Sequence, residues 1–208
     1  MAMEREIKLA VADGFELPSL DGVGGVAAVE RGSRVLEATY WDTDSLALFT
    51  YGRGLRYRTR DGADGTWTLK GPSTRAGGDA VEREELEAEG SPHAIPDAVQ
   101  ARVVALAGDQ PLHPVAVVRN HRRVVDLTIG GRPVAELVDD HVTVLDPTGR
   151  EATRFREVEV ELSSGSDPGA VEAVIERLRA AGATADPTGK YARALLALGL
   201  VEPSQIRR

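Results

Sequence analysis

The 208-residue chain contains no cysteine. Neither a disulfide framework nor a thiolate metal site is therefore available to it, which fits a reducing compartment. Long apolar runs are also missing, since no stretch approaches the roughly 18 residues of a membrane span. The first residues lack the basic-then-apolar order of a signal peptide. These absences lead us to expect a cytoplasmic protein with no membrane partner.

Positive charge is scarce overall, because the formal net charge is −8 and the pI is near 5.1. A general nucleic-acid binder needs a broad basic surface, so nucleic acid is not an expected partner. Any anionic ligand must be held by a local basic site or by metal. Lysine is the rarest cation: Lys8, Lys70 and Lys190 stand among 22 arginines.

Two common functional motifs are also missing. The nearest string to a P-loop ends in Gly189-Lys190 but lacks both the leading glycine and the following Ser or Thr. Zinc is not expected either, because no HxH or HExxH spacing occurs among the histidines. The histidines are His93, His113, His121 and His141.

Several segments instead alternate a charged face with an apolar face, as strands do. In the opening segment, Glu4, Glu6 and Lys8 share one face. The same period recurs in the segments 55–60, 66–70, 83–87, 119–127, 134–145 and 156–162. Gly- and Asp-rich turns separate them, which predicts an antiparallel meander.

Helices are fewer in this pattern. Helical spacing and end signals predict helices at 167–182, 96–106 and 190–198, with a short turn at 45–49. No linker divides the chain, so we expect one domain over residues 1–200 and a polar tail or linker start at 201–208. The roles of segments 13–35 and 141–155 stay open.

The charged faces have two interpretations. A strand with one polar face is usually half-solvated, and each segment taken singly fits that reading. As a set they divide into acidic strands and basic strands, which an open surface does not require. If the faces point into a closed barrel, they form a polar tunnel, and a polyanion with divalent cations would satisfy both walls.

The order of these motifs resembles the CYTH superfamily, the triphosphate tunnel metalloenzymes. Glu4-x-Glu6-x-Lys8 is similar to its ExExK signature. The resemblance continues over nearly the whole chain. It is carried by Gly54-Leu55-Arg56-Tyr57-Arg58, Leu69-Lys70-Gly71, Arg83-x-Glu85-x-Glu87, Arg123, Ala135-Glu136-Leu137 with Asp140, Glu157-x-Glu159-x-Glu161, and Lys190-Tyr191.

The resemblance implies an α+β fold, namely a closed eight-stranded antiparallel barrel with helices packed outside it. It further implies three sets of site residues. Triphosphate would be bound by Lys8, Arg56, Arg58, Lys70, Arg123 and Lys190. Metal would be held by Glu4, Glu6, Glu157 and Glu159. Possible additional site residues are Arg83, Glu85, Glu136, Asp140 and Glu161. Arg122 and Arg123 point oppositely in a regular strand, so only one of them can face the tunnel; Arg123 is the predicted one, and a bulge would reverse the choice.

The implied chemistry is metal-dependent, with Mg²⁺ or Mn²⁺ as cofactor. One ion would neutralise phosphate oxygens and a second would orient water for in-line attack. Lys8, with Glu4 and Glu6, is therefore a catalytic candidate. Lys8 would also manage a proton if Arg56 and Arg58 lowered its pKa, although nearby carboxylates act in the opposite direction.

Inorganic triphosphate is the substrate that we predict, giving pyrophosphate and orthophosphate. The family resemblance leaves open a thiamine or nucleoside triphosphatase and an adenylyl cyclase. A non-catalytic polyphosphate-binding module is the alternative from another class. CYTH domains often precede a helical CHAD domain, so a C-terminal CHAD partner is a further expectation.

Overall fold

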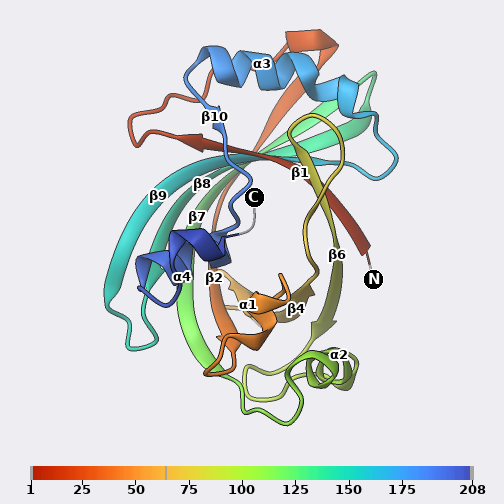
Figure 1. Cartoon of the computed structure of the whole chain (residues 1–208). Coiled ribbons are helices and arrows are strands. Elements are labelled where there is room, and N and C mark those ends of the chain that lie inside the picture. The colour runs from red at the N-terminus through yellow and green to blue at the C-terminus, as the bar shows by residue number, and fades with distance from the viewer. Residues whose placement is uncertain (1, 64, 207–208) are drawn as a thin grey trace.

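Within residues 2–63 and 65–206, which the computed structural model describes, eight long strands close into one antiparallel barrel (Figure 1). Their order around the barrel is β1-β9-β8-β7-β2-β3-β4-β6, and β6 pairs back with β1. The strands are β1 (Ala2–Val11), β2 (Ala27–Asp42), β3 (Gly54–Arg60), β4 (Thr66–Lys70), β6 (Ala80–Glu89), β7 (His113–Ile129), β8 (Arg132–Leu145) and β9 (Glu151–Leu162). The predicted fold class is confirmed.

Strand β1 closes the ring. Its residues 2–7 pair with β6, and its residues 6–11 pair with β9. Because side chains alternate along a strand, its even-numbered residues all point into the barrel at this junction. Two short strands extend the margins: β5 (Thr74–Arg75) pairs with β6, and β10 (Thr184–Ala185) pairs with β1.

Helices cover the barrel at three places. Helix α2 (Asp97–Ala107) packs on the outer face of β3 and β4, and α3 (Glu172–Ala180) packs on the outer face of β1 and β7 to β9. Helix α4 (Lys190–Ala197) instead contacts inward-facing residues, including Tyr40 and Val118. It therefore lies at one end of the tunnel, inside the curve of the sheet in Figure 1.

The helix predictions agree closely with the structure. Each of the four predicted helical segments overlaps a helix, and α1 (Ala47–Thr50) corresponds to the predicted short turn. The 3₁₀ segments are η1 (Val23–Gly25), η2 (Pro168–Val171) and η3 (Pro203–Gln205). No helix in the described part of the chain has the length and apolarity to cross a membrane.

Strand β2 is the element that the sequence pattern did not predict. Its last residues are packed on both faces: Tyr40 contacts α4 inside the barrel, whereas Trp41 lies against Trp67 outside it. A strand buried on both faces loses the polar and apolar alternation. The segments of unknown role are thereby explained in part, since residues 27–35 belong to β2, and residues 141–145 and 151–155 belong to β8 and β9.

Residues 12–26 and 201–206 are ordered parts of this fold. Phe15, Leu20 and Val26 are buried in the cluster beneath α3. At the other end Val201 is buried, and Gln205 and Ile206 line the tunnel. The described part of the predicted polar tail therefore packs back on the barrel.

Candidate functional site

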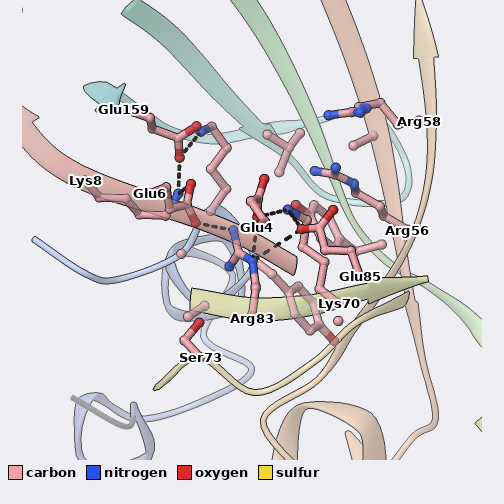
Figure 2. A pocket seen from close by; sticks show the side chains of 18 of the residues that line it. Glu4, Glu6, Lys8, Arg56, Arg58, Lys70, Ser73, Arg83, Glu85 and Glu159 are labelled. Carbon is pink, nitrogen blue, oxygen red and sulfur yellow. Dashed lines mark hydrogen bonds and ion pairs between the residues drawn. The ribbon is translucent and has the colours of Figure 1, made fainter. Parts of the chain in front are cut away.

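The barrel encloses a cavity of about 480 Å³, and about half of the residues that line it are charged (Figure 2). Among the described residues, ten basic and seven acidic side chains line it. The basic ones are Lys8, Arg34, Arg53, Arg56, Arg58, Arg60, Lys70, Arg83, Arg122 and Lys190, and the acidic ones are Glu4, Glu6, Glu85, Glu87, Glu136, Glu159 and Glu161. The tunnel is therefore positive within a chain of net negative charge.

One group of carboxylates forms where β1 meets β9. Glu4 and Glu6 alternate along β1, and Glu161 of β9 is directly paired with Glu6. Oxygen atoms of the three side chains lie within 4.8 Å of one another. Carboxylate oxygens are the ligands that Mg²⁺ and Mn²⁺ prefer, so the donor set fits a hard divalent cation.

Arg83 of β6 compensates this first group. Its Nε donates to Glu4 at 2.8 Å, and its guanidinium also forms an ion pair with Glu6. Burial disfavours charge on Glu4, yet Lys70 and Arg83 together hold the pKa of Glu4 well below its usual value. Glu4 is therefore a carboxylate at neutral pH.

A second group of carboxylates lies deeper, between β8 and β9. Asp140, Glu157 and Glu159 are all buried, with oxygen atoms within 4.8 Å of one another. The ammonium of Lys190, the first residue of α4, lies 2.9 Å from Asp140 and 3.0 Å from Glu159, and it also pairs with Glu157. The ammonium of Lys190 thus neutralises a group of carboxylates that could also bind a metal ion.

Lys8 lies between the two acidic groups, as Figure 2 shows. Its Nζ is 3.2 Å from Glu6 and also forms an ion pair with Glu159. Burial lowers the pKa of Lys8, but the attraction of Glu159 and Glu6 outweighs burial and raises it above its usual value. The carboxylates, and not Arg56 or Arg58, therefore dominate the charge of Lys8, and this is the opposite of the lowered pKa that proton transfer by Lys8 requires.

The opposite wall is basic. Arg56 and Arg58 alternate on β3, with Lys70 on the neighbouring strand β4. The positive charge of Arg56, followed by burial, lowers the pKa of Arg58 to about 10. Burial, Arg56 and Arg83 likewise lower the pKa of Lys70. Like charges held this close favour binding of an anion between them.

Arg56 carries one further sign of an incomplete site. The residue is buried, and its Nε has no hydrogen-bond partner within the described chain. A buried donor without a partner costs about 1–3 kcal/mol. Figure 2 shows the Arg56 and Arg58 side chains on the side of the cavity opposite Glu6 and Glu159.

The placement of Arg123 in the tunnel is wrong. Arg123 points outward, where it is about 41% exposed and pairs with Glu30. Arg122 is the residue that lines the tunnel, donating to Asp140 through Nε at 2.8 Å and Nη2 at 2.7 Å. The pairing of β7 with β8 is regular at these residues, so no bulge reversed the orientation and the error lay in the choice of face.

The additional candidates all gather at the tunnel. Arg83, Glu85, Glu136 and Glu161 line the cavity, and Asp140 lies just behind it against Arg122 and Lys190. Glu157 is placed likewise behind the cavity by its contact with Lys190. All the predicted site residues except Arg123 are therefore brought to one place.

Several lining residues were not predicted, among them Arg60, Arg34, Tyr40 and Asn120. Arg60 continues the alternation of Arg56 and Arg58, so its parity was a usable signal. Arg34 and Tyr40 lie on β2, the strand without a recognisable pattern. Asn120, two residues before Arg122, is buried with its Oδ1 unpartnered within the described residues.

Comparison with known proteins supports one family. The model of the CYTH domain matches residues 2–190. Two uncharacterized proteins of Mycobacterium tuberculosis, from strains CDC 1551 and H37Rv, are each 33% identical to this chain over 219 residues. The alignment covers 98% of this chain but 42% of each relative, so the chain spans less than half of their length.

Solved structures share the architecture. A Hippeastrum protein, HpAC1, described as an adenylyl cyclase candidate with a dominant triphosphatase activity, aligns with a TM-score of 0.60 and 21% identity over 96% of this chain and 98% of its own. A Bacillus halodurans protein described as an adenylate cyclase candidate aligns with a TM-score of 0.63 and 21% identity over 93% and 98%. At this identity the likeness concerns the fold. Because the family model matches nearly the whole chain, this protein belongs to the CYTH domain family.

Proposed function

We propose that this protein hydrolyses inorganic triphosphate to pyrophosphate and orthophosphate in a metal-dependent reaction. The observation that carries the proposal is that one cavity brings cationic side chains, among them Arg56 and Arg58, together with two groups of carboxylates. Cationic side chains can bind phosphate oxygens while carboxylates hold divalent metal. A polyanion with its metal complements both walls at once.

Phosphate binding falls to the basic side chains. Arg56 and Arg58 lie opposite Glu6 and Glu159. Lys70 lies on the strand next to them and pairs with Glu4 and Glu85. Arg122 takes the place first assigned to Arg123. Arginine binds phosphate through two parallel hydrogen bonds, whereas lysine acts as a compact charge. The unpartnered Nε of Arg56 would gain a hydrogen-bond partner from an incoming phosphate.

Metal would be held by the carboxylate groups. Glu4, Glu6 and Glu161 form the group that faces the cavity, and Asp140 joins Glu157 and Glu159 in the deeper group. When bound, Mg²⁺ or Mn²⁺ would neutralise phosphate charge and make water a better nucleophile. Both groups already pair with a cationic side chain, Lys190 in the deeper group and Arg83 in the cavity-facing one. All three carboxylates of the cavity-facing group line the cavity, so this group is the first choice for the ion.

Lys8 contributes a fixed positive charge at the boundary of the two walls. Its ammonium is held by Glu6 and Glu159, which fixes its position without rearrangement. Preorganised charge of this kind stabilises the charge that develops on the transferred phosphoryl group. Lys8→Ala should therefore lower the rate of hydrolysis by about a hundredfold or more.

The experiment is orthophosphate release from inorganic triphosphate, ATP and thiamine triphosphate, each with Mg²⁺, with Mn²⁺ and with chelator. Turnover of inorganic triphosphate that requires metal supports the proposal. Preference for an organic triphosphate would move the assignment to that substrate, and cyclic AMP with pyrophosphate from ATP would indicate a cyclase. Binding without turnover of any of them would contradict hydrolysis and favour a polyphosphate-binding module.

A further inference from the structure

Arg34 is a tunnel residue with an unusual environment. It lies on β2 directly opposite Arg122 of β7, and both side chains line the cavity. Like charges on directly opposed residues of one sheet face repel. Arg122 is compensated by three carboxylates, whereas the ion pair that Arg34 forms within the described chain is with Glu136. Positive charge is therefore in excess at this position.

The guanidinium of Arg34 is also incompletely bonded. Its Nε is shielded from solvent and has no hydrogen-bond partner among the described residues. Its Nη2 donates to Glu136 at 3.3 Å, at the long end of the normal range. A shielded donor without a partner is costly, and an anion in the cavity would supply that partner.

The surroundings place Arg34 at a solvent-facing mouth of the tunnel. The side chains of Arg34 and Glu136 are 26% and 35% exposed, whereas that of Lys8 is 5% exposed. A partly exposed ion pair with one contact contributes little to stability. A phosphate group, by contrast, can take two parallel hydrogen bonds from a guanidinium. The Arg34 guanidinium is therefore expected to bind a phosphate group in preference to Glu136.

We propose that Arg34 is a phosphate-binding residue at the tunnel mouth and that Glu136 is its counter-ion while the tunnel holds no polyanion. The exchange sets the affinity for triphosphate, because Glu136 competes with the ligand for one guanidinium. The proposal rests on the proposed function in taking triphosphate as the ligand. It concerns binding and not the bond-breaking step.

The test is isothermal titration of tripolyphosphate into the metal-free protein with chelator present. Arg34→Ala should weaken binding about tenfold, as expected for the loss of a charge-assisted hydrogen bond, and Arg34→Lys should recover part of the loss. Glu136→Gln should tighten binding, because it removes the competitor. Arg31→Ala is the matched control on the same strand, since Arg31 is exposed and pairs with Asp126 outside the cavity lining. This variant should bind tripolyphosphate with the affinity of the wild type.

Arg34→Ala and Glu136→Gln are expected to change the affinity for tripolyphosphate in opposite directions, and this distinguishes a role in binding from a purely structural role. If the Arg34–Glu136 pair only supported the barrel, both substitutions would weaken binding and lower the melting temperature together, and the proposal would be overturned. Equal affinities of Arg34→Ala and wild type, or no binding of tripolyphosphate by the wild type, would also overturn it. Wild-type binding without hydrolysis in the metal-dependent assay would contradict the proposed function alone, and the affinity ratios would still decide the role of Arg34.

Discussion

Arg122 and Arg123 are consecutive residues of β7 that experience opposite environments. Arg122 is buried against Asp140, whereas Arg123 pairs with Glu30 at the surface.

Arg122→Ala should abolish most hydrolysis and lower the free energy of unfolding by about 3–5 kcal/mol, because it leaves Asp140 buried without this partner. Arg123→Ala should change unfolding by no more than about 1 kcal/mol, as for other exposed ion pairs. Urea unfolding measures the stability of each variant, and phosphate release measures its activity. Equal losses of stability and activity in the two variants would contradict the placement of Arg122 inside the tunnel and Arg123 outside it.

The raised pKa of Glu161 should make the stability of the protein depend on pH. Burial, then repulsion from Glu159, raises its pKa from 4.5 to about 7, although Arg122 acts in the opposite direction. A carboxyl whose pKa is raised in the folded state stabilises the fold below its unfolded value, and that contribution is lost as the pH rises through the folded value. Metal-free protein should therefore lose this contribution between about pH 4.5 and pH 7.

The corresponding variant is Glu161→Gln, which cannot titrate. Urea unfolding with chelator at pH 5 and pH 8 should show a smaller drop in stability for the variant than for the wild type. The difference between wild type and variant should therefore change with pH. A difference of the same size at both pH values would rule out titration of Glu161 in this range.

At the scale of elements, one buried carboxylate joins β2, α1 and α4. Asp42 accepts hydrogen bonds from the backbone N–H groups of Leu48 and Phe49 at 2.9 Å and from the hydroxyl of Tyr191 at 2.8 Å. Tyr191 also stacks on Tyr40, with ring centroids 4.7 Å apart. These contacts fix α4, and with it Lys190, at the end of the tunnel.

Tyr191→Phe tests this junction. Removing the hydroxyl should lower the free energy of unfolding by about 1–3 kcal/mol, because the buried carboxylate loses a donor. Tyr51→Phe is the control, since Tyr51 is 55% exposed and should change stability by less than about 0.5 kcal/mol. Chemical unfolding of both variants provides the comparison. Indistinguishable stabilities would show that the hydroxyl does not hold α4.

For the whole molecule, the tunnel couples ligand binding to stability. Cationic side chains that repel one another in the folded state gain a shared counter-ion when a polyanion enters. Tripolyphosphate at about a hundred times its dissociation constant should therefore stabilise the fold by about 2.7 kcal/mol. For a chain of this size, that corresponds to a rise in melting temperature of roughly 5–10 °C.

Thermal unfolding with chelator present measures this effect, with sodium sulfate at equal ionic strength as the control. The rise should shrink as salt is added, because ions screen the attraction. A rise as large with sulfate as with tripolyphosphate would indicate general anion screening and not a site for a chain of phosphates.

The sequence by itself determined the strands that carry one charged face. Glu4, Glu6 and Lys8, or Arg56 and Arg58, alternate so regularly that period two places them together without knowledge of the fold. The order of these motifs also determined the family and hence the closed barrel. Helix ends marked by proline and glycine were likewise readable, because those residues restrict the backbone locally.

Only the tertiary structure decided the rest. The choice between Arg122 and Arg123 depends on which face of β7 closes inward, and parity alone does not specify it. Arg34 follows residues of β2 that are mostly exposed on both faces, so no polar and apolar alternation marked it before the barrel placed it beside Arg122. The pairing of Glu161 with Glu6, and of Lys190 with Asp140, joins segments far apart in sequence. Ring closure, a property of the assembled sheet, brings such residues together.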